Sequence, residues 1–234
     1  MITRKQPTRR RKALRWLSLL VLLTALLTLH GQYHFFLIQG IRDAERQGGI
    51  GPTKLVAELP GDEDLQDERH QVRANEKGMM VASFRIMSSV STTGWGAWYA
   101  AYLDCTDSAP FHAGFFIFAN HADTLGENYK MWADHYGRID DPEADAVRLD
   151  VYRNGSLLET HTVSKEDWIH VDGRTYFALE FPWDPWYWQN LENGWVYSQL
   201  LDEEGHLLAG KEFALGKTKW GLVDDILSLG PLYQ

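Results

Sequence analysis

The N-terminal segment constrains this chain most, because a cationic head runs directly into an apolar stretch. Seven cations lie between Arg4 and Arg15, and the next 14 residues, Trp16 to Leu29, carry no charge. A spanning helix needs about 20 apolar residues. Apolar and aromatic side chains return after a short polar patch, and a helix from Trp16 to Ile38 would reach roughly 34 Å. We therefore predict a basic head over residues 1–15 and a transmembrane signal-anchor over residues 16–38.

A cleaved secretory signal is the alternative interpretation of the same segment, since it also begins with cations and an apolar stretch. Cleavage needs an A-x-A-like pair of small residues, and the best candidate, Gly31, has Leu29 two residues before it. The missing small residues favour an anchor that is retained.

The distribution of charge predicts the orientation of this anchor. All seven cations precede the apolar run, and no acidic residue occurs before Gly31. Cations near a membrane helix stay on the cytoplasmic side. The N-terminus is therefore expected in the cytoplasm and the C-terminal domain outside the cell membrane, in a bacterial periplasm.

The exterior part of the chain is strongly acidic, which limits its partners. The whole chain has 23 basic and 32 acidic residues, so removing the seven N-terminal cations leaves 16 basic residues against the same 32 acidic ones. Such a domain repels nucleic acid, and no nucleic-acid partner is expected. Cys105 is the only cysteine, which excludes an intramolecular disulfide and a cysteine-based zinc cluster. Its apolar surroundings in the sequence predict a buried, inert thiol.

Beyond the anchor the texture of the sequence predicts a linker and then a β domain. Residues 39–77 are rich in glycine, proline and acidic side chains and show no lasting hydrophobic period, which favours a linker. Residues 78–234 contain short apolar stretches separated by turn signals. The stretches lie at Met80–Ile86, Trp95–Cys105, Phe111–Asn120 and Thr175–Phe181. The segment Ala122–Ala146 shows no alternation and is expected to be a loop with one helical turn.

Two hairpins are predicted in this domain. Asn154-Gly155 is a strong turn signal between Arg148–Arg153 and Ser156–Val163, and it sets Val151 opposite Leu158. Glu203-Glu204-Gly205 separates a second pair of strands. About eight strands at this spacing predict a mainly β fold, an antiparallel β-sandwich of Ig-like or jelly-roll-like type.

The densest candidate binding feature is aromatic. Trp183, Trp186, Tyr187, Trp188 and Trp195 fall within 13 residues. Tryptophan and tyrosine dominate protein interfaces, and their flat faces also stack on sugar rings. These five residues are the predicted partner- or ligand-binding residues, although several of them could instead close the end of a hydrophobic core.

Sequence motifs offer little evidence for catalysis. Neither a G-x-S-x-G motif, nor a P-loop, nor a G-x-G-x-x-G motif occurs in the sequence. A set of histidines and aspartates has the donor atoms that zinc uses, but it lacks the HExxH spacing, and no metal or other cofactor is expected from it. The members of this set are His112, His121, Asp123, Asp134 and His135.

Location and composition together favour a non-enzymatic role. We expect a single-pass, membrane-anchored accessory or structural subunit whose exterior domain docks to a protein partner in the envelope. A carbohydrate-binding module would use the same tryptophans to hold a glycan. An anchored hydrolase would need convergent carboxylates or His–Asp pairs, whose separation cannot be read from the sequence.

Overall fold

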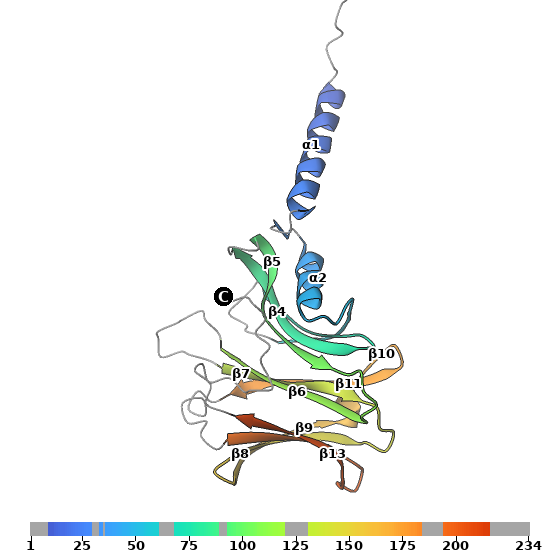
Figure 1. Cartoon of the computed structure of the whole chain (residues 1–234), viewed down its shortest axis with the longest axis vertical. Coiled ribbons are helices and arrows are strands. Elements are labelled where there is room, and N and C mark those ends of the chain that lie inside the picture. The colour runs from blue at the N-terminus through green and yellow to red at the C-terminus, as the bar shows by residue number, and fades with distance from the viewer. Residues whose placement is uncertain are drawn as a thin grey trace, which may run out of the picture.

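The structure of the protein, a computed structural model, describes residues 9–29, 33–34, 36–60, 68–88, 93–119, 131–183 and 194–215. A long helix stands away from a stack of β-sheets, and a short second helix covers the nearest sheet (Figure 1). The helices are α1 (Arg9–Leu29), α2 (Leu37–Gln47) and a 3-10 turn, η1 (Lys165–Asp167). The fold is mainly β with antiparallel sheets, as the sequence predicts.

Thirteen strands are present in the described residues, and they form three sheets. The first sheet has the order β1-β5-β4-β3-β2, the central sheet β10-β11-β7-β6, and the third sheet β13-β12-β8-β9. The bounds are β1 (Tyr33–His34), β2 (Lys54–Leu59), β3 (Arg69–Ala74), β4 (Gly78–Ser88), β5 (Thr93–Asp104), β6 (Phe111–Ala119), β7 (Met131–Ile139), β8 (Ala146–Arg153), β9 (Ser156–Ser164), β10 (Ile169–Val171), β11 (Arg174–Trp183), β12 (Gly194–Leu201) and β13 (Leu207–Leu215). All strand pairs are antiparallel except the short parallel pair of β1 with β5.

The central sheet lies between the other two, so both of its faces are buried (Figure 1). An Ig-like or jelly-roll-like sandwich, as predicted, has two sheets, whereas the described residues of this chain form three. Eight of the nine residues of β7 are buried. A strand that is buried on both faces loses the alternation of polar and apolar residues. For this reason the prediction of a loop over residues 122–146 is wrong for β7.

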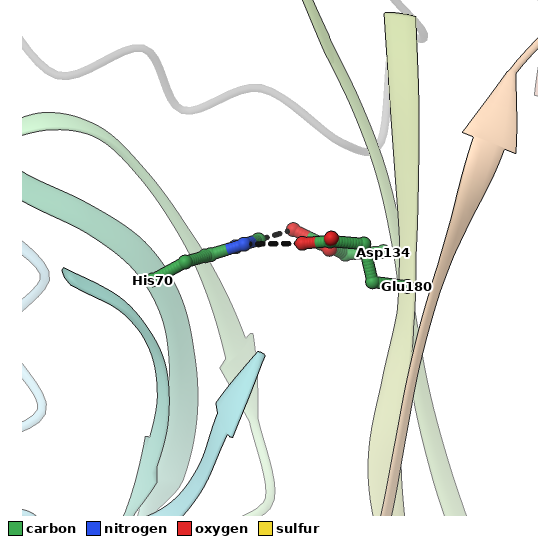
Figure 2. Close-up of side chains that lie close together, drawn as sticks. All are labelled: His70, Asp134 and Glu180. Carbon is green, nitrogen blue, oxygen red and sulfur yellow. Dashed lines mark hydrogen bonds and ion pairs between the residues drawn. The ribbon is translucent and has the colours of Figure 1, made fainter. Parts of the chain in front are cut away.

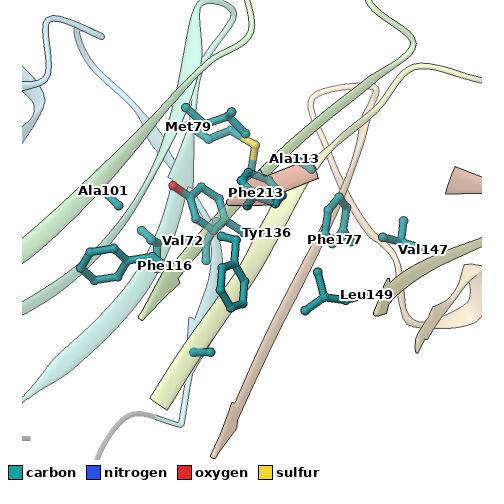
Figure 3. Close-up of a cluster of buried hydrophobic side chains, with 14 of the residues drawn as sticks. Val72, Met79, Ala101, Ala113, Phe116, Tyr136, Val147, Leu149, Phe177 and Phe213 are labelled. Atoms are coloured by element: carbon teal, nitrogen blue, oxygen red, sulfur yellow. The ribbon is translucent and has the colours of Figure 1, made fainter. Parts of the chain in front are cut away.

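One hydrophobic core joins the three sheets (Figure 3). Val72 and Met79 come from the first sheet, Phe116 and Phe177 from the central sheet, and Leu149 from the third. Because side chains of a strand alternate between faces, the central sheet supplies apolar groups to both interlayers. The core therefore closes without any contribution from α1.

A second, smaller core lies on the opposite face of the first sheet, under α2. Ile41 and Ala44 of the helix are buried against Met80 and Phe84 of β4. The phenol of Tyr102 donates a hydrogen bond of 2.8 Å to the carbonyl oxygen of Ala44. These contacts make α2 an integral part of the domain.

Buried polar groups attach the same helix to the strands that follow it. The Glu45 carboxylate, 2% exposed, accepts hydrogen bonds from the Thr53 backbone N–H at 2.6 Å and from the Thr53 hydroxyl at 2.5 Å. Arg73 of β3 donates to the Thr53 hydroxyl from Nε at 3.1 Å. The predicted linker over residues 39–77 is therefore wrong, because most of α2 and all of β2 and β3 lie within it and pack on the domain. The folded domain begins near residue 33 rather than at 78.

The N-terminal helix differs from the predicted anchor at its C-terminal end. Helix α1 ends at Leu29, and Leu37 and Ile38 belong to α2. Between them, β1 pairs with β5, and the buried ring of His34 donates from Nδ1 to the carbonyl oxygen of Trp95 at 2.8 Å. A helix that continued to Ile38 would break these contacts. Within the described parts of the chain, no helix combines the length and the apolar character needed to cross a membrane.

Both predicted hairpins are confirmed, with a correction to the register of the first. Asn154 and Gly155 form the turn between β8 and β9 with positive φ angles of 48° and 77°, as a two-residue turn requires. The pairing then shifts between Val151 and Tyr152, so that Val151 lies opposite Glu159 instead of Leu158. An extra residue in one strand is a β-bulge, and it displaces every later pair by one position.

Close packing of α2 on the first sheet leads to a stability prediction. A Cβ atom at Gly40 would lie 2.7 Å from the carbonyl oxygen of Trp95. Overpacking of this kind costs about 1–3 kcal/mol when backbone must shift. We expect Gly40→Ala to lower the free energy of unfolding by that amount in urea denaturation, while Gln47→Ala at an exposed position of α2 leaves it nearly unchanged. Equal stability of both variants would contradict the close approach of α2 to β5.

Candidate functional site

An imidazole and two carboxylates lie together between the first and central sheets (Figure 2). His70 of β3 donates from Nε2 to Oδ2 of Asp134 at 3.0 Å, and its Nδ1 lies 2.5 Å from Oε2 of Glu180. The side chains of His70, Asp134 and Glu180 are 0%, 0% and 1% exposed. We call these three residues the buried triad.

Strand register places the buried triad. His70 pairs with Ser83, and Ser83 pairs with Tyr99, so one row of side chains crosses the first sheet. Asp134 pairs with Glu180 in the same way on the central sheet. Because paired residues point to the same face, the two rows meet in the interlayer.

Aromatic rings surround the imidazole of the buried triad. The Tyr99 hydroxyl lies 3.1 Å from Nε2 of His70, and the ring of Phe118 meets the imidazole at 5.2 Å with an interplanar angle of 80°. Tyr99 and Phe118 stack on each other at 4.6 Å. Electrostatic interactions are stronger in such apolar surroundings than in water.

Burial and charge fix the protonation states of the cluster. Burial by itself would lower the pKa of His70, but the carboxylates of Asp134 and Glu180 raise it to about 10. Burial raises the pKa of Asp134 to about 6, although the charge and hydrogen bond of His70 oppose this shift. Burial and the neighbouring acidic groups raise the pKa of Tyr99 well above its usual value. At neutral pH the triad thus holds an imidazolium beside an ionised Asp134 and a neutral phenol.

This arrangement has the donor atoms for two kinds of chemistry. Carboxylates and an imidazole in contact can exchange a proton, as general acids and bases do. They can also hold a metal ion, since one donor atom from each triad residue falls within 4.8 Å of the others. Donor atoms also lie within 4.8 Å of one another in an exposed group beside the second hairpin turn, formed by Asp202, Glu204 and His206.

The sequence identifies only Asp134 of the buried triad. His70 falls in the predicted linker, and Glu180 falls in a predicted strand without being singled out. Both carboxylates can be noticed in the sequence, because each stands next to apolar residues. Asp134 follows Ala133, and Glu180 lies between Leu179 and Phe181. A charged residue inside an apolar strand needs a buried partner, and His70 is that partner.

The other residues of the predicted metal set do not join Asp134. His135 follows it on β7 and therefore points to the other face, where its Nε2 lies 2.7 Å from the Ser198 hydroxyl. Burial lowers the pKa of His135 to about 3, so this ring is neutral. His112 lies on the same face as Asp134 but at the far end of that interlayer, where its ring is 3.1 Å from the Arg138 guanidinium. His121 and Asp123 lie outside the described residues.

The predicted aromatic binding residues separate into core, surface and undescribed positions. Trp183 is 2% exposed and packs against Phe115 at 5.5 Å, so its assignment as a binding residue is wrong and it belongs to the core. Trp195 is half-buried on β12. Trp186, Tyr187 and Trp188 lie outside the described residues.

Trp195 belongs to an aromatic strip on the face of the third sheet that points away from the core. Its ring stacks on Tyr152 at 4.0 Å with an interplanar angle of 6°, and Tyr197 follows at 6.3 Å. The ring of Tyr197 lies over Gly210, where a Cβ would approach the phenol oxygen to 2.5 Å. We call Tyr152, Trp195 and Tyr197 the outer aromatic strip.

Hydrogen-bonding side chains lie on the same strands as the outer aromatic strip. Gln199 donates to the Asp150 carboxylate at 2.6 Å and accepts from Arg148 at 3.0 Å. The Thr160 hydroxyl donates to the other oxygen of Asp150 at 2.8 Å. The face thus combines aromatic rings with an ordered polar network.

The lone cysteine is confirmed as a buried residue. Cys105 is a free thiol at 3% exposure, and burial raises its pKa to about 12. A thiol that stays protonated is a poor nucleophile.

Comparison of the chain with protein-family models, with curated proteins and with solved structures finds no match.

The buried triad predicts that stability falls as the pH rises. Folding raises the pKa of His70 from 6.5 to about 10, so its stabilisation is complete below pH 6.5 and is lost as the pH approaches 10. Asp134 acts in the same direction between pH 3.8 and about 6. We expect the free energy of unfolding to fall by up to about 1.4 kcal/mol per pH unit in the histidine range. Urea denaturation of the full chain at several pH values, with a chelator present, measures this slope.

Two histidine variants separate the triad from other titrating groups. His70→Gln removes the imidazolium and should flatten the dependence in the histidine range. His135→Gln changes a buried histidine that is already neutral, so it should keep the slope of the natural chain. The same slope in the natural chain and in His70→Gln would show that the triad does not carry this pH dependence.

Proposed function

We propose that this chain is a membrane-anchored accessory or structural subunit whose β domain docks to another component of a cell envelope. The single observation that supports it best is the exposure of α1. Trp16 is 73% exposed, and the leucines from Leu17 to Leu26 are also exposed, whereas the hydrophobic core of the domain includes none of them. Exposed apolar surface of this extent marks an interaction with a membrane or a partner.

The charge pattern of α1 favours a membrane, rather than a protein partner, as the surface that covers the apolar side chains of this helix. Arg9 to Lys12 and Arg15 lie at its start, and the residues from Trp16 to Leu29 are uncharged. Cations at one end of an apolar helix suit anionic headgroups on the cytoplasmic side. In this proposal the domain faces the opposite side, the periplasm of a bacterium. Helix α1 supplies the apolar part of the anchor in place of residues 16–38, although the described helices alone lack the length and apolar character of a membrane span.

The outer aromatic strip is the proposed docking surface for a protein partner. Tryptophan and tyrosine contribute large contact areas at little cost in conformational entropy, and they are enriched among interface hot spots. The stacked pair of Tyr152 and Trp195 has few accessible ring faces, because each ring covers the other at 4.0 Å. Fewer ring faces are left for stacking on a sugar, so a packed protein interface is the better fit.

Two alternative functions keep some support. A glycan could use Tyr197 together with Arg148 and Thr160, the accessible members of the polar network around Asp150, which is itself 3% exposed. Within the described residues, the buried triad is the set of carboxylates and histidine that an anchored hydrolase would use, and its carboxylates are 0% and 1% exposed. Substrate would reach them only after the two sheets separate, so this alternative is the weaker.

Membrane fractionation tests the anchor. We expect the full chain to sediment with membranes and to stay there after washing with high salt or alkaline carbonate. A variant that lacks residues 1–29 should appear in the soluble fraction, because the apolar surface of α1 is gone while the core is intact. Release of the full chain by salt alone would show that only charge holds it, and would refute the anchor.

A native pull-down tests the docking surface. The tagged full chain, extracted in mild detergent, should retain a stoichiometric partner that Trp195→Ala with Tyr197→Ala loses. The control is Ile86→Ala, which removes an exposed apolar side chain from the first sheet and should keep the partner. A chain that elutes alone, with tryptophan fluorescence that glycans quench, would favour the carbohydrate-binding alternative. The pair Trp186→Ala and Trp188→Ala extends the test to the undescribed tryptophans.

A further inference from the structure

We propose that the buried triad binds one divalent transition-metal ion of the zinc, manganese or iron(II) class. This inference does not depend on the membrane attachment or on the docking surface. His70, Asp134 and Glu180 would supply the donor atoms, and the ion would join the first sheet to the central sheet.

The geometry of the triad places the donor atoms within reach of a single ion, which would take one nitrogen of His70 and draw in the carboxylate that now faces the other nitrogen. One donor atom of each residue lies within 4.8 Å of the other two, although the residues come from three strands of two sheets. The 3.0 Å between Nε2 of His70 and Oδ2 of Asp134 is close to the spacing of neighbouring donors around an ion with bonds of about 2.0–2.2 Å. Figure 2 shows both carboxylates directed at the imidazole.

Charge compensation favours a divalent ion over a proton. With a neutral imidazole, the two ionised carboxylates carry a formal charge of −2, which a divalent ion neutralises completely. A single proton on the imidazole leaves one negative charge without compensation in the interlayer. Buried charge that is not compensated is costly, so the divalent ion is the better counter-ion for this set of residues.

An unsatisfied oxygen atom is a second, independent indication of a missing ligand. Oδ1 of Asp134 is fully buried and accepts no hydrogen bond from any residue that the structure describes. Nearly all buried polar atoms in proteins have a partner, and a carboxylate oxygen is among the most costly to leave without one. A metal ion beside Asp134 would satisfy this atom.

The donor set indicates the class of metal. An imidazole with two carboxylates suits zinc, manganese and iron(II), whereas magnesium and calcium prefer oxygen donors alone. The Tyr99 hydroxyl, 3.1 Å from Nε2 of His70, is placed to bind the ion or to hydrogen-bond one of its ligands. The packed rings of Tyr99 and Phe118 would hold the imidazole in one orientation, as the surroundings of metal ligands do.

The exposed group of Asp202, Glu204 and His206 provides a matched control. Its donor atoms also lie within 4.8 Å of one another, but Asp202 already accepts hydrogen bonds from the His206 backbone at 2.7 Å and from its ring at 3.1 Å. A surface group of this kind would bind metal weakly if at all. His206→Gln removes its imidazole without touching the interlayer.

Metal binding by the full chain in mild detergent tests the inference. After removal of metal with a chelator, zinc or manganese ions are titrated by calorimetry, and bound metal is counted by elemental analysis. We expect one ion per chain and a rise in the thermal unfolding temperature. Asp134→Asn should weaken binding by about 10–100-fold or more, and His206→Gln should bind like the natural chain.

Three outcomes would overturn the inference. They are a folded natural chain that binds neither ion at millimolar concentration, equal binding by the natural chain and Asp134→Asn, and loss of binding in His206→Gln. If Asp134→Asn does not fold, the natural chain still decides the question. Manganese ions should broaden the histidine NMR signals of His70 and leave those of His206 sharp, and the reverse result would place the ion at the surface.

Discussion

Burial of the central sheet on both faces is the constraint on which the rest of this structure depends. A sheet with one solvent face can place its polar side chains in water, and this one has no such face over most of β6 and β7. Every polar residue of those strands therefore needs a partner from a neighbouring layer. Asp134 finds His70 in the first sheet, and His135, one residue later, finds Ser198 in the third. Two consecutive residues thus connect three layers.

The burial of the central sheet also explains why the triad is a candidate functional site. Its charged side chains lie in the core, where they are costly, and not on the surface. Two carboxylates in one dry interlayer raise the free energy of the folded state unless a positive charge accompanies them. The imidazolium of His70 compensates one of them, and a bound cation would compensate both. Apolar residues could fill the same volume without this cost in free energy. Packing alone therefore does not account for the three polar side chains of the triad.

Much of the β structure could be predicted from local sequence signals, and the failures have physical causes. The turn at Asn154-Gly155 is determined by residues that tolerate positive φ, and it is confirmed. The register beyond it depends on a bulge at Leu158, which no residue pattern predicts.

Strand β7 was missed because the alternation of polar and apolar residues disappears when both faces of a strand are buried. Residues 39–77 resembled a linker because several of their buried members are polar, such as Glu45 and Arg73, which both hydrogen-bond to Thr53. His70 was missed because it falls in the predicted linker, and only the pairing of β3 with β4 places it in the interlayer opposite Asp134.

The short connection between α1 and the domain limits how far the two can separate. Helix α1 ends at Leu29 and β1 begins at Tyr33, so the intervening chain spans at most about 15 Å even when fully extended. A 30-residue tether would let the domain search a wide volume, but this connection keeps the first sheet and α2 close to the end of α1. If α1 lies in a membrane, any surface recognised by the domain must lie within one domain length of the lipid. The protein would act at short range, and lateral diffusion in the bilayer would carry it to its partner.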